Sequence, residues 1–477
     1  MKLREILHNI ETLQVIGSTD MFISELSIDS RNITQGNLFF AIPGTEVDGH
    51  TYIQQAIQQG ALAIVCEVLP EQLTPSVCYI QVSHTSSVVG IMASTFFGNP
   101  TQELTVIGVT GTNGKTSIAY SLYHALLLQK KEVALFSTIS NILNGEVFQA
   151  GHTTEDAISL QRHMRQVADG GAKFVCMEVS SHALEQGRVQ GVDFDIALYT
   201  NLTQDHLDYH HTMEAYAKAK KKFFDMLKPS SVAIVNADDS YAEYMVEETK
   251  ASIKYYGMTN GEYRISSPEL EMTQSSWMIQ DTRVVSKHIG LFNVYNQTCV
   301  YAVLDTLGFE DADKTLSMIP GIPGRMEMVS SAEKGITGIV DYAHTPDALK
   351  KVLETISLVP HRKIITIFGC GGDREREKRP QMARIAEELS DIVIVTSDNP
   401  RTEDQNQIFS DIEKGFTKSA TEHAVITERN EAIKRGVQIA QEGDVILIAG
   451  KGHENYQIIG TSRFPFNDKE ILQSLLS

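Results

Sequence analysis

The stretch LTVIGVTGTNGKTS, residues 104–117, constrains the fold of this chain more than any other segment. An apolar run typical of a buried strand ends at a glycine-rich loop, and the following residues, SIAYSLYHALLLQKK, place apolar side chains at helical spacing. A strand, a glycine-rich loop and a helix in this order are typical of proteins that hold a phosphate in the loop. The sequence therefore predicts an α/β domain with a mostly parallel sheet.

The residue types of the loop suit phosphate binding. Gly111 and Gly114 let backbone N–H groups wrap around a phosphate, Lys115 can neutralise its charge, and Thr116 supplies a hydroxyl for Mg²⁺. The strict Walker A spacing would require a glycine where the chain has Val109. An ordinary glycine turn before a helix is the alternative, but the neighbouring lysine and threonine favour phosphate binding.

Strands and helices alternate along the rest of the chain, which predicts three α/β domains. At 477 residues, the chain is too long for one ordinary core, because a domain usually takes about 100 to 200 residues. Residues 1–98 predict a small N-terminal α/β domain, and residues 99–328 a central P-loop ATPase-like domain with a mostly parallel sheet. Residues 329–477 predict a doubly wound, Rossmann-like domain, which binds ligands at its strand ends.

The composition excludes several classes of protein. The chain has 41 Lys plus Arg against 60 Asp plus Glu, a net charge of −19, which argues against a surface that binds nucleic acid by counterion release. Its five cysteines lack CxxC spacing and fit reduced thiols better than a disulfide framework. No apolar run approaches the roughly 18 residues of a membrane span. We expect a soluble, monomeric, cytoplasmic protein that does not insert into membranes.

Two further segments carry candidate ligands. Glu178 ends an apolar strand, from which a carboxylate can hold a metal ion or water beside the phosphates; a surface carboxylate is the alternative. The stretch TNLTQDHLDYHHTMEAYAKAKKKFF concentrates histidine and lysine in an acidic chain. Most of these lysines are expected on the solvated face of an amphipathic helix, because only an inward-facing residue can reach a nucleotide.

These segments resemble motifs of the Mur ligase family. The resemblance extends across nearly the whole chain and includes the stretches EVSSHALEQGRV, PGRMEM, DYAHTPDAL, FGCGGDREREKRPQM, DNPRTED and AGKGHENYQ. The resemblance implies an ATP-dependent ligase that forms an amide bond through an acyl phosphate. It is strongest to members that add meso-2,6-diaminopimelate to UDP-N-acetylmuramoyl-L-alanyl-D-glutamate in peptidoglycan precursor synthesis. It also identifies TGTNGKT as this family's form of the phosphate loop, which folylpolyglutamate synthases share.

The resemblance gives each domain a ligand. It implies that residues 1–98 bind the UDP-sugar precursor, residues 99–328 bind ATP and residues 329–477 bind the amino acid. The ATP loop would comprise Gly111, Thr112, Asn113, Gly114, Lys115, Thr116 and Ser117, and the rest of ATP would contact Asn296, Arg325, Asp341 and His344. Because Arg325 lies at the predicted boundary between the second and third domains, it could grip phosphate on domain closure, and a hinge salt bridge is the alternative.

The resemblance also implies a catalytic centre with two Mg²⁺ ions. The implied catalytic residues are Lys115, Glu178, His206 and Lys220, and the implied metal ligands are Thr116, Glu178, His206 and Lys220. Lys220 would act as a carbamate formed with CO₂, which needs a neutral amine, and burial depresses the pKa of lysine. Lys221 and Lys222 are neighbouring alternatives for the carbamate.

The UDP-muramoyl dipeptide would be held by residues of the first two domains. The resemblance assigns Ser30 to its uridine diphosphate end, and it assigns to the muramoyl dipeptide Thr153, Thr154, Ser180, Gln186 and Arg188. Arg188 suits a carboxylate or phosphate partner, whereas serine and threonine in turns usually cap their own backbone. Relatives commonly have proline after the two threonines, and this chain has Glu155.

The amino acid would be selected by the third domain. The resemblance assigns to it Arg374, Asp398, Asn399, Pro400, Arg401, Gly450 and Glu454. Relatives that add diaminopimelate have DNPR and lysine-adding relatives lack its arginine; diaminopimelate has a further carboxylate, which Arg401 can bind bidentately. Glu377 stands where relatives commonly have glycine. Taken alone, DNPR is a turn signal with a surface arginine.

Two other functions stay open at the level of sequence. A folylpolyglutamate synthase would share the phosphate loop and the lysine carbamate, but it would not need DNPR or the N-terminal DSR motif. A nucleotide-dependent regulatory switch would exchange or hydrolyse nucleotide without an amine acceptor, and it gives no reason for the set of Glu178, His206 and Lys220.

Overall fold

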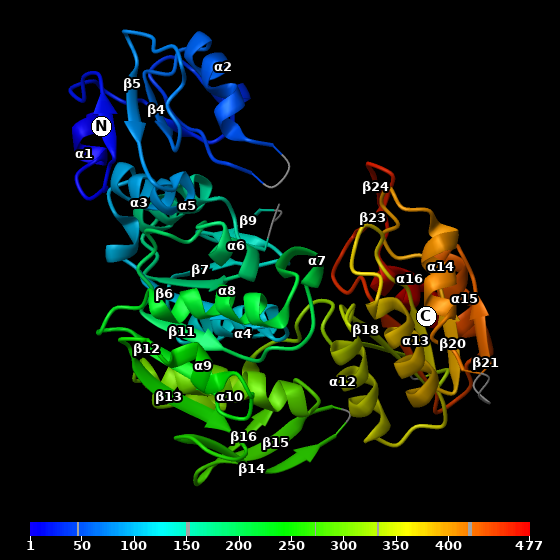
Figure 1. The fold of residues 1–477 in the computed structure, drawn as a ribbon. Helices are drawn as coiled ribbons and strands as arrows, with labels where there is room; N and C mark the ends of the chain where they lie inside the picture. Colours follow the sequence, from blue (N-terminus) through cyan, green and yellow to red (C-terminus); the bar gives the residue numbers. More distant parts are fainter. Residues whose placement is uncertain (45–46, 149–152, 272, 332, 418–421) are drawn as a thin grey trace.

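The computed structural model describes residues 1–44, 47–148, 153–271, 273–331, 333–417 and 422–477. Figure 1 shows three α/β domains: the N-terminal one in blue, the central one in cyan to green, and the C-terminal one in yellow to red beside the central one. The predicted three-domain α/β fold is therefore confirmed. No helix among the described residues is long and apolar enough to cross a membrane.

The N-terminal domain is built on a sheet with strand order β1-β5-β4-β3-β2, in which the β1 edge is antiparallel and the other pairs are parallel. Its strands are β1 Gln14–Ile16, β2 Leu26–Ser27, β3 Leu38–Phe40, β4 Ala63–Cys66 and β5 Cys78–Gln81. Its helices are α1 Leu3–Ile6, α2 Ile53–Gln58 and α3 Thr85–Phe96. A Cβ at Gly90 would lie 2.0 Å from the carbonyl oxygen of Gln190, so glycine is needed where α3 approaches the central domain.

The central sheet has strand order β16-β15-β14-β13-β12-β11-β6-β10-β7-β8-β9. The strands are β6 Thr105–Thr110, β7 Val133–Phe136, β8 Asn141–Leu143, β9 Glu146–Phe148, β10 Phe174–Glu178, β11 Ile196–Tyr199, β12 Val232–Asn236, β13 Ser252–Gly257, β14 Tyr263–Leu270, β15 Ser275–Ile279 and β16 Thr282–Ser286. Strand β6 lies between β10 and β11 and is parallel to both. Since parallel strands end at the same edge, the segments after these strands converge there.

Helices cover both faces of the central sheet. Apolar residues of α5 Ala157–Asp169, α6 Ser181–Glu185, α8 Met213–Asp225 and α9 Ala242–Val246 belong to one core cluster. Residues of α4 Lys115–Leu128, α10 Leu291–Thr306 and α11 Ala312–Met318 belong to the cluster on the other face. The short helix α7 Leu207–His210 precedes α8. The sheet edges are antiparallel at β7-β8-β9 and β14-β15-β16, where the predicted alternation of strand and helix gives way to hairpins.

The C-terminal domain has strand order β17-β18-β22-β19-β20-β21, parallel except for β17 at the edge. The strands are β17 Glu327–Ser331, β18 Ile336–Asp341, β19 Ile364–Phe368, β20 Ile392–Val395, β21 Glu422–Val425 and β22 Val445–Ala449, with the hairpin β23 Tyr456–Ile459 and β24 Ser462–Pro465. The helices are α12 Pro346–Ser357, α13 Lys378–Leu389, α14 Gln405–Glu413, α15 Arg429–Ile439 and α16 Asp468–Leu476. Core clusters on both faces make this sheet doubly wound.

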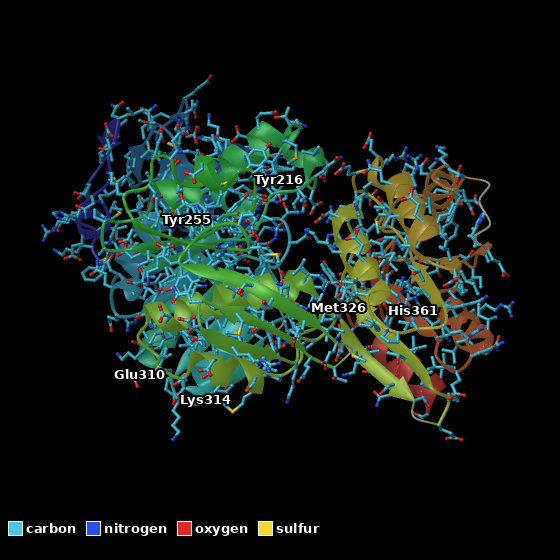
Figure 2. All side chains as sticks on the ribbon, turned by 90° about the horizontal axis from the view of Figure 1, so that it is seen from below. Tyr216, Tyr255, Glu310, Lys314, Met326 and His361 are labelled. Atoms are coloured by element: carbon cyan, nitrogen blue, oxygen red, sulfur yellow. The ribbon has the colours of Figure 1, made fainter. Side chains whose placement is uncertain are left out.

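The domain bounds predicted from the sequence, 1–98, 99–328 and 329–477, remain a proposal. Strand β17 already begins at Glu327, so the first strand of the C-terminal sheet starts just before the proposed boundary at residue 329. In Figure 2, which is seen from below, Met326 lies where the central and C-terminal domains meet. All five cysteines are described, and each is a buried free thiol.

Candidate active site

The strand ends of the central sheet open into a cavity of about 720 Å³ between the central and C-terminal domains. The predicted site residues in its walls include Lys115, Thr116, Glu178, His206, Lys220, Arg325, Arg374, Arg401 and Glu454. A second cavity of about 470 Å³ adjoins it and shares these lining residues: Asn113, Gly114, Arg325, Tyr342 and His344. Residues of two domains therefore converge on the phosphate loop.

The phosphate loop follows β6 and leads directly into α4. Gly111 and Gly114 have φ angles of 146° and 92°, and a Cβ at Gly111 would lie 1.8 Å from the Thr200 hydroxyl, so only glycine fits there. The Lys115 ammonium donates to the carbonyl oxygens of Gly111 and Thr112 at 2.9 and 2.8 Å. Lys115 is thus folded onto its own loop, at the N-terminus of a helix that attracts anions.

Thr116 and Glu178 meet beside the loop. The Thr116 hydroxyl donates to Oε2 of Glu178 at 3.0 Å, and Oε1 accepts from the backbone N–H of Thr138 at 2.7 Å. Glu178 is only 1% exposed, so it is not the surface carboxylate that was the alternative. A hydroxyl and a carboxylate beside phosphate oxygens fit Mg²⁺, which usually takes one or two protein ligands and keeps several waters.

Lys220 lies on the inner face of α8 and reaches the same loop. Its side-chain nitrogen donates to the Gly111 carbonyl at 2.8 Å and lies 4.6 Å from the ring centre of Tyr216. Burial, with the charge of Lys115 adding to it, places the pKa of Lys220 well below its ordinary value. A neutral amine at this position is the state that can take up CO₂.

The other lysines of α8 face elsewhere. Lys218 is exposed. Lys221 forms ion pairs with Asp225 and Glu248, and Lys222 forms one with Glu185. All of these residues are described, and among them Lys220 alone donates to the phosphate loop.

His206 stands at the start of α7 with a left-handed backbone, φ 55°. Its Nε2 lies 3.4 Å from Oδ2 of Asp205, and its ring is 4.9 Å from that of His182. Burial lowers the pKa of His206, although the negative charge of Asp205 acts to raise it. The lowered pKa favours the neutral imidazole, which is the form that can ligate a metal. Within the described residues, no group of three or more His, Cys, Asp or Glu is arranged to hold a metal ion.

The residues predicted for the dipeptide substrate divide between two places. Thr153, Thr154, Ser180 and Arg188 line the large cavity. Arg188 donates from Nη1 to the Thr154 carbonyl at 2.9 Å and from Nε to Oε1 of Gln186 at 2.9 Å, so Gln186 supports it from outside the wall. Ser30 is buried in the N-terminal domain, outside both cavities, and donates to Oε1 of Gln55 at 3.3 Å.

Glu155, which stands where the family resemblance leads us to expect proline, has partners of its own. Its Oε1 accepts from the Asn141 side chain at 2.9 Å, and its Oε2 lies 2.7 Å from Nδ1 of His163. These contacts tie the segment of Thr153 and Thr154 to β8 and α5. The second departure, Glu377, is exposed at the start of α13 and lines neither cavity.

The residues predicted for the amino acid form a connected group. Arg374, Arg401 and Glu454 line the large cavity. Asn399 donates to Oε2 of Glu454 at 2.8 Å. Behind this wall lie the other predicted residues, Asp398, Asn399, Pro400 and Gly450. Gly450 has a φ angle of 119°, and a Cβ there would lie 2.6 Å from Oδ2 of Asp398.

Lys451 was missed by sequence reasoning. It is fully buried, and its ammonium donates to Oε2 of Glu454 at 2.8 Å and to Oδ1 of Asn399 at 3.1 Å. Its position between two glycines directly after the apolar β22 is the signal that could have identified it.

The predicted adenosine residues Asn296, Arg325, Asp341 and His344 all line the smaller cavity, with Ser117. The Arg325 guanidinium donates to the Thr116 hydroxyl at 3.1 Å and lies 4.5 Å from the ring centre of Tyr342. Arg325 therefore contacts the phosphate loop itself. Asn113 of the loop also donates to Asp347 of α12 at 2.8 Å, so both domains touch the loop.

Family models match all three domains, and several relatives match the full length of the chain. Residues 22–97 match the catalytic domain of the Mur ligase family, residues 109–304 the Mur ligase middle domain, and residues 324–452 the Mur ligase glutamate ligase domain. The chain is 43% identical over 483 residues to the UDP-N-acetylmuramoyl-L-alanyl-D-glutamate--2,6-diaminopimelate ligase of Bacteroides fragilis, with 100% of this chain and 99% of that protein covered. It is 44% identical over 483 residues to the ligase of the same name from Phocaeicola vulgatus, with 100% of both covered. A solved structure of a ligase of that name has a TM-score of 0.70 and 35% identity, with 100% of this chain and 98% of that chain covered.

Proposed function

Because this chain belongs to the Mur ligase family, we propose that it is an ATP-dependent ligase that joins meso-2,6-diaminopimelate to UDP-N-acetylmuramoyl-L-alanyl-D-glutamate. The observation that carries the proposal is one cavity whose walls hold a phosphate loop on one side and Arg374, Arg401 and Glu454 on the other. A phosphoryl group and an amino acid with an additional carboxylate can therefore meet in the same space. The buried free thiols fit a reducing compartment, and the proposal includes a cytoplasmic monomer.

The proposed reaction has two steps. In the first, an oxygen of the substrate's free D-glutamyl carboxylate attacks the γ-phosphorus of ATP, the bond to the bridging oxygen breaks, and ADP leaves. In the second, the amine of diaminopimelate attacks the acyl carbon, the bond to the phosphate oxygen breaks, and phosphate leaves while the nitrogen loses a proton. The first step phosphorylates an oxygen of the carboxylate, which is otherwise a poor leaving group, so that phosphate can leave in the second step. It depends mainly on positioning and on neutralisation of charge.

The chain's own residues supply those two requirements. Lys115 places a positive charge at the loop, and Arg325 adds a second one beside Thr116. Arg188, which lines the cavity, would orient an anionic group of the dipeptide. Glu454, held by Lys451 and Asn399, offers a carboxylate to the ammonium group of the incoming amino acid.

The proposal includes two Mg²⁺ ions and a carbamate on Lys220. Thr116 and Glu178 would hold one ion, and His206 with the carbamate would hold the second. Mg²⁺ supplies neutralisation of phosphate charge when it is bound. Lys220 supports this assignment by its burial and by its contact with Gly111, which place its nitrogen at the loop.

Release of ADP tests the proposed function directly. The protein is incubated with Mg²⁺, ATP and UDP-N-acetylmuramoyl-L-alanyl-D-glutamate, with meso-diaminopimelate, with L-lysine or without an amino acid. We expect ADP release and a tripeptide product of matching mass with diaminopimelate. Release that depends on folate and glutamate instead would favour a folylpolyglutamate synthase. Release without any amine acceptor would favour a nucleotide switch.

The selectivity for diaminopimelate is assigned to Arg401. Replacing Arg401 by alanine is expected to lower kcat/KM for meso-diaminopimelate by about a hundredfold, because a bidentate partner of the additional carboxylate is lost. Any activity with L-lysine should change little. Arg384→Ala is the matched control, since Arg384 is exposed on α13 and lines neither cavity. An equal fall with both amino acids would remove Arg401 as the source of selectivity.

A further inference from the structure

Arg374 and Arg401 line the same cavity but come from different loops of the C-terminal domain. Arg374 lies in residues 371–377, after β19, and Arg401 lies in residues 398–404, after β20. Each loop contains a non-glycine residue with a left-handed backbone, Asp373 with φ 54° and Arg401 with φ 52°. Such conformations cost free energy and persist when surrounding contacts hold them.

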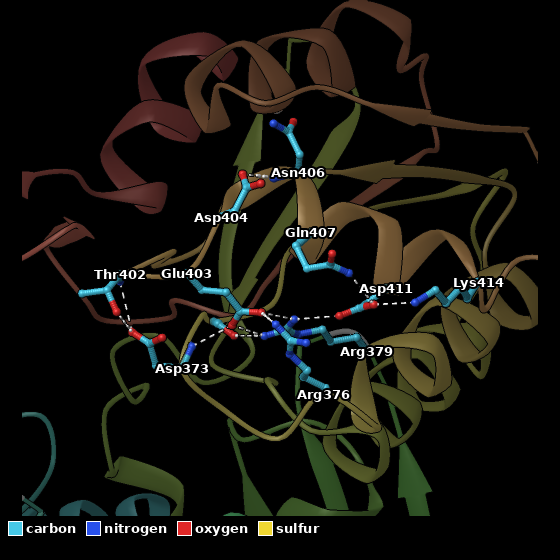
Figure 3. A network of polar contacts seen from close by, with 11 residues as sticks. Asp373, Arg376, Arg379, Thr402, Glu403, Asp404, Asn406, Gln407, Asp411 and Lys414 are labelled. Atoms are coloured by element: carbon cyan, nitrogen blue, oxygen red, sulfur yellow. Dashed lines mark hydrogen bonds and ion pairs between the residues drawn. The ribbon is translucent and has the colours of Figure 1, made fainter.

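Two carboxylates hold these loops together, and each binds a backbone N–H of the other loop (Figure 3). Oε2 of Glu403 accepts from the N–H of Asp373 at 2.9 Å. In return, Oδ2 of Asp373 accepts from the N–H and the hydroxyl of Thr402 at 3.1 and 2.9 Å. Arg401 joins this connection, because its Nη1 donates to the Gly372 carbonyl at 2.9 Å. The placement of one arginine therefore depends on the backbone of the other's loop.

Glu403 also fixes both loops to the body of the domain. Its two oxygens accept from Nη1 and Nη2 of Arg379 at 2.8 and 2.7 Å, and Oε1 accepts from Arg376 at 2.7 Å. Arg379 belongs to α13, is fully buried, and donates to Asp411 of α14 at 3.0 Å. The bonds from Arg379 hold the pKa of Glu403 at about 2, so its carboxylate is charged throughout the neutral range.

We propose that Glu403 is a positioning residue that sets the relative placement of Arg374 and Arg401, and through it the preference for an amino acid with an additional carboxylate. The inference rests on the proposed function for its substrate. Recognition of a planar carboxylate by guanidinium groups depends on fixed geometry, and a site loosened by about 1 Å loses much of its effect. Glu403 itself lines neither cavity, so it acts through the two arginines.

The test compares Glu403→Gln with Asp411→Asn in the full-length protein. Glutamine keeps the shape of the side chain but removes the charge and replaces one acceptor oxygen by a donor. Asparagine at 411 removes the other carboxylate on Arg379 and leaves the N–H groups of both loops untouched. We expect E403Q to raise the KM for meso-diaminopimelate about tenfold, which corresponds to the loss of one charge-assisted contact. The KM for ATP should stay unchanged, and D411N should alter neither constant by more than about twofold.

A milder variant covers the case in which E403Q does not fold. Thr402→Val removes only the hydroxyl bond to Asp373. It is expected to raise the KM for diaminopimelate by a smaller factor than E403Q does. If E403Q lowers the use of all three substrates equally, the role of Glu403 is stability alone and the inference falls. If E403Q does not fold and T402V lowers the use of all three substrates equally, the connection between the two loops does not set the preference, and the inference falls as well.

Amide hydrogen exchange separates this inference from the proposed function. Faster exchange is expected at residues 371–377 and 398–404 in E403Q, and unchanged exchange in D411N. If the wild-type protein does not ligate diaminopimelate, the proposed function fails, while the exchange still decides whether Glu403 holds the loops. Exchange in E403Q that equals the wild type would overturn the positioning role.

Discussion

Replacing Lys115 by alanine is expected to reduce kcat for ADP release by at least about a hundredfold, the usual loss when one preorganised charge partner of a transition state is removed. The Lys115 ammonium lies against the phosphate loop at 2.9 Å from the Gly111 carbonyl, so we expect it to neutralise charge on the transferring phosphoryl group. The amino-acid site belongs to another domain, and the KM for diaminopimelate should therefore change little.

The control for Lys115→Ala is Lys218→Ala, since Lys218 is exposed on α8 and lines neither cavity. Thermal unfolding shows whether either variant has lost its fold. If K115A is folded and turns over at close to the wild-type rate, Lys115 has no part in phosphoryl transfer.

The second large effect is expected at Lys220. Lys220→Ala should have almost no activity, because the proposed carbamate supplies an anionic oxygen that alanine cannot provide, and a small added carboxylate such as acetate should restore part of it. The nitrogen is buried beside the Gly111 carbonyl, and the space left by the side chain lies at the loop. Labelling the wild-type protein with ¹³CO₂ should give a carbamate signal that the variant lacks.

Lys222→Ala is the matched control for Lys220, because Lys222 lies on the same helix and pairs with Glu185 at its surface. It should keep full activity without added carboxylate. Full activity of K220A without rescue would move the carbamate to another residue.

The features that the sequence predicted well are those encoded in local segments. The apolar run of β6, the two glycines and the start of α4 follow one another in the chain, so their pattern predicts the loop directly. The alternation of strands and helices likewise predicted the three α/β domains, but not the hairpins at both edges of the central sheet. Those edges depend on strand pairing, which local pattern does not determine.

Tertiary contacts decided what local pattern left open. Lys220, Lys221 and Lys222 have the same side chain and adjacent positions, and only the packing of α8 shows which one is turned toward the loop. Lys451 and Glu403 were missed because each also bonds to a residue of a distant segment, Asn399 for Lys451 and Asp373 for Glu403, and local pattern does not bring such segments together. Ser30, predicted for the uridine diphosphate end of the precursor, is buried in the N-terminal domain, apart from the residues predicted for the muramoyl dipeptide.

The central position of β6 bears on when the protein becomes able to bind nucleotide during its synthesis. Strand β6 is made early, but its neighbours β10 and β11 follow much later in the chain, and both must be present before β6 is paired on its two sides. Closing such long connections is slow compared with forming a helix. Arg325 and Asp347, which contact the loop, are made later still. A nascent chain released before these segments would therefore carry the complete TGTNGKT motif without a formed nucleotide site, and its apolar residues 105–110 would remain unpaired.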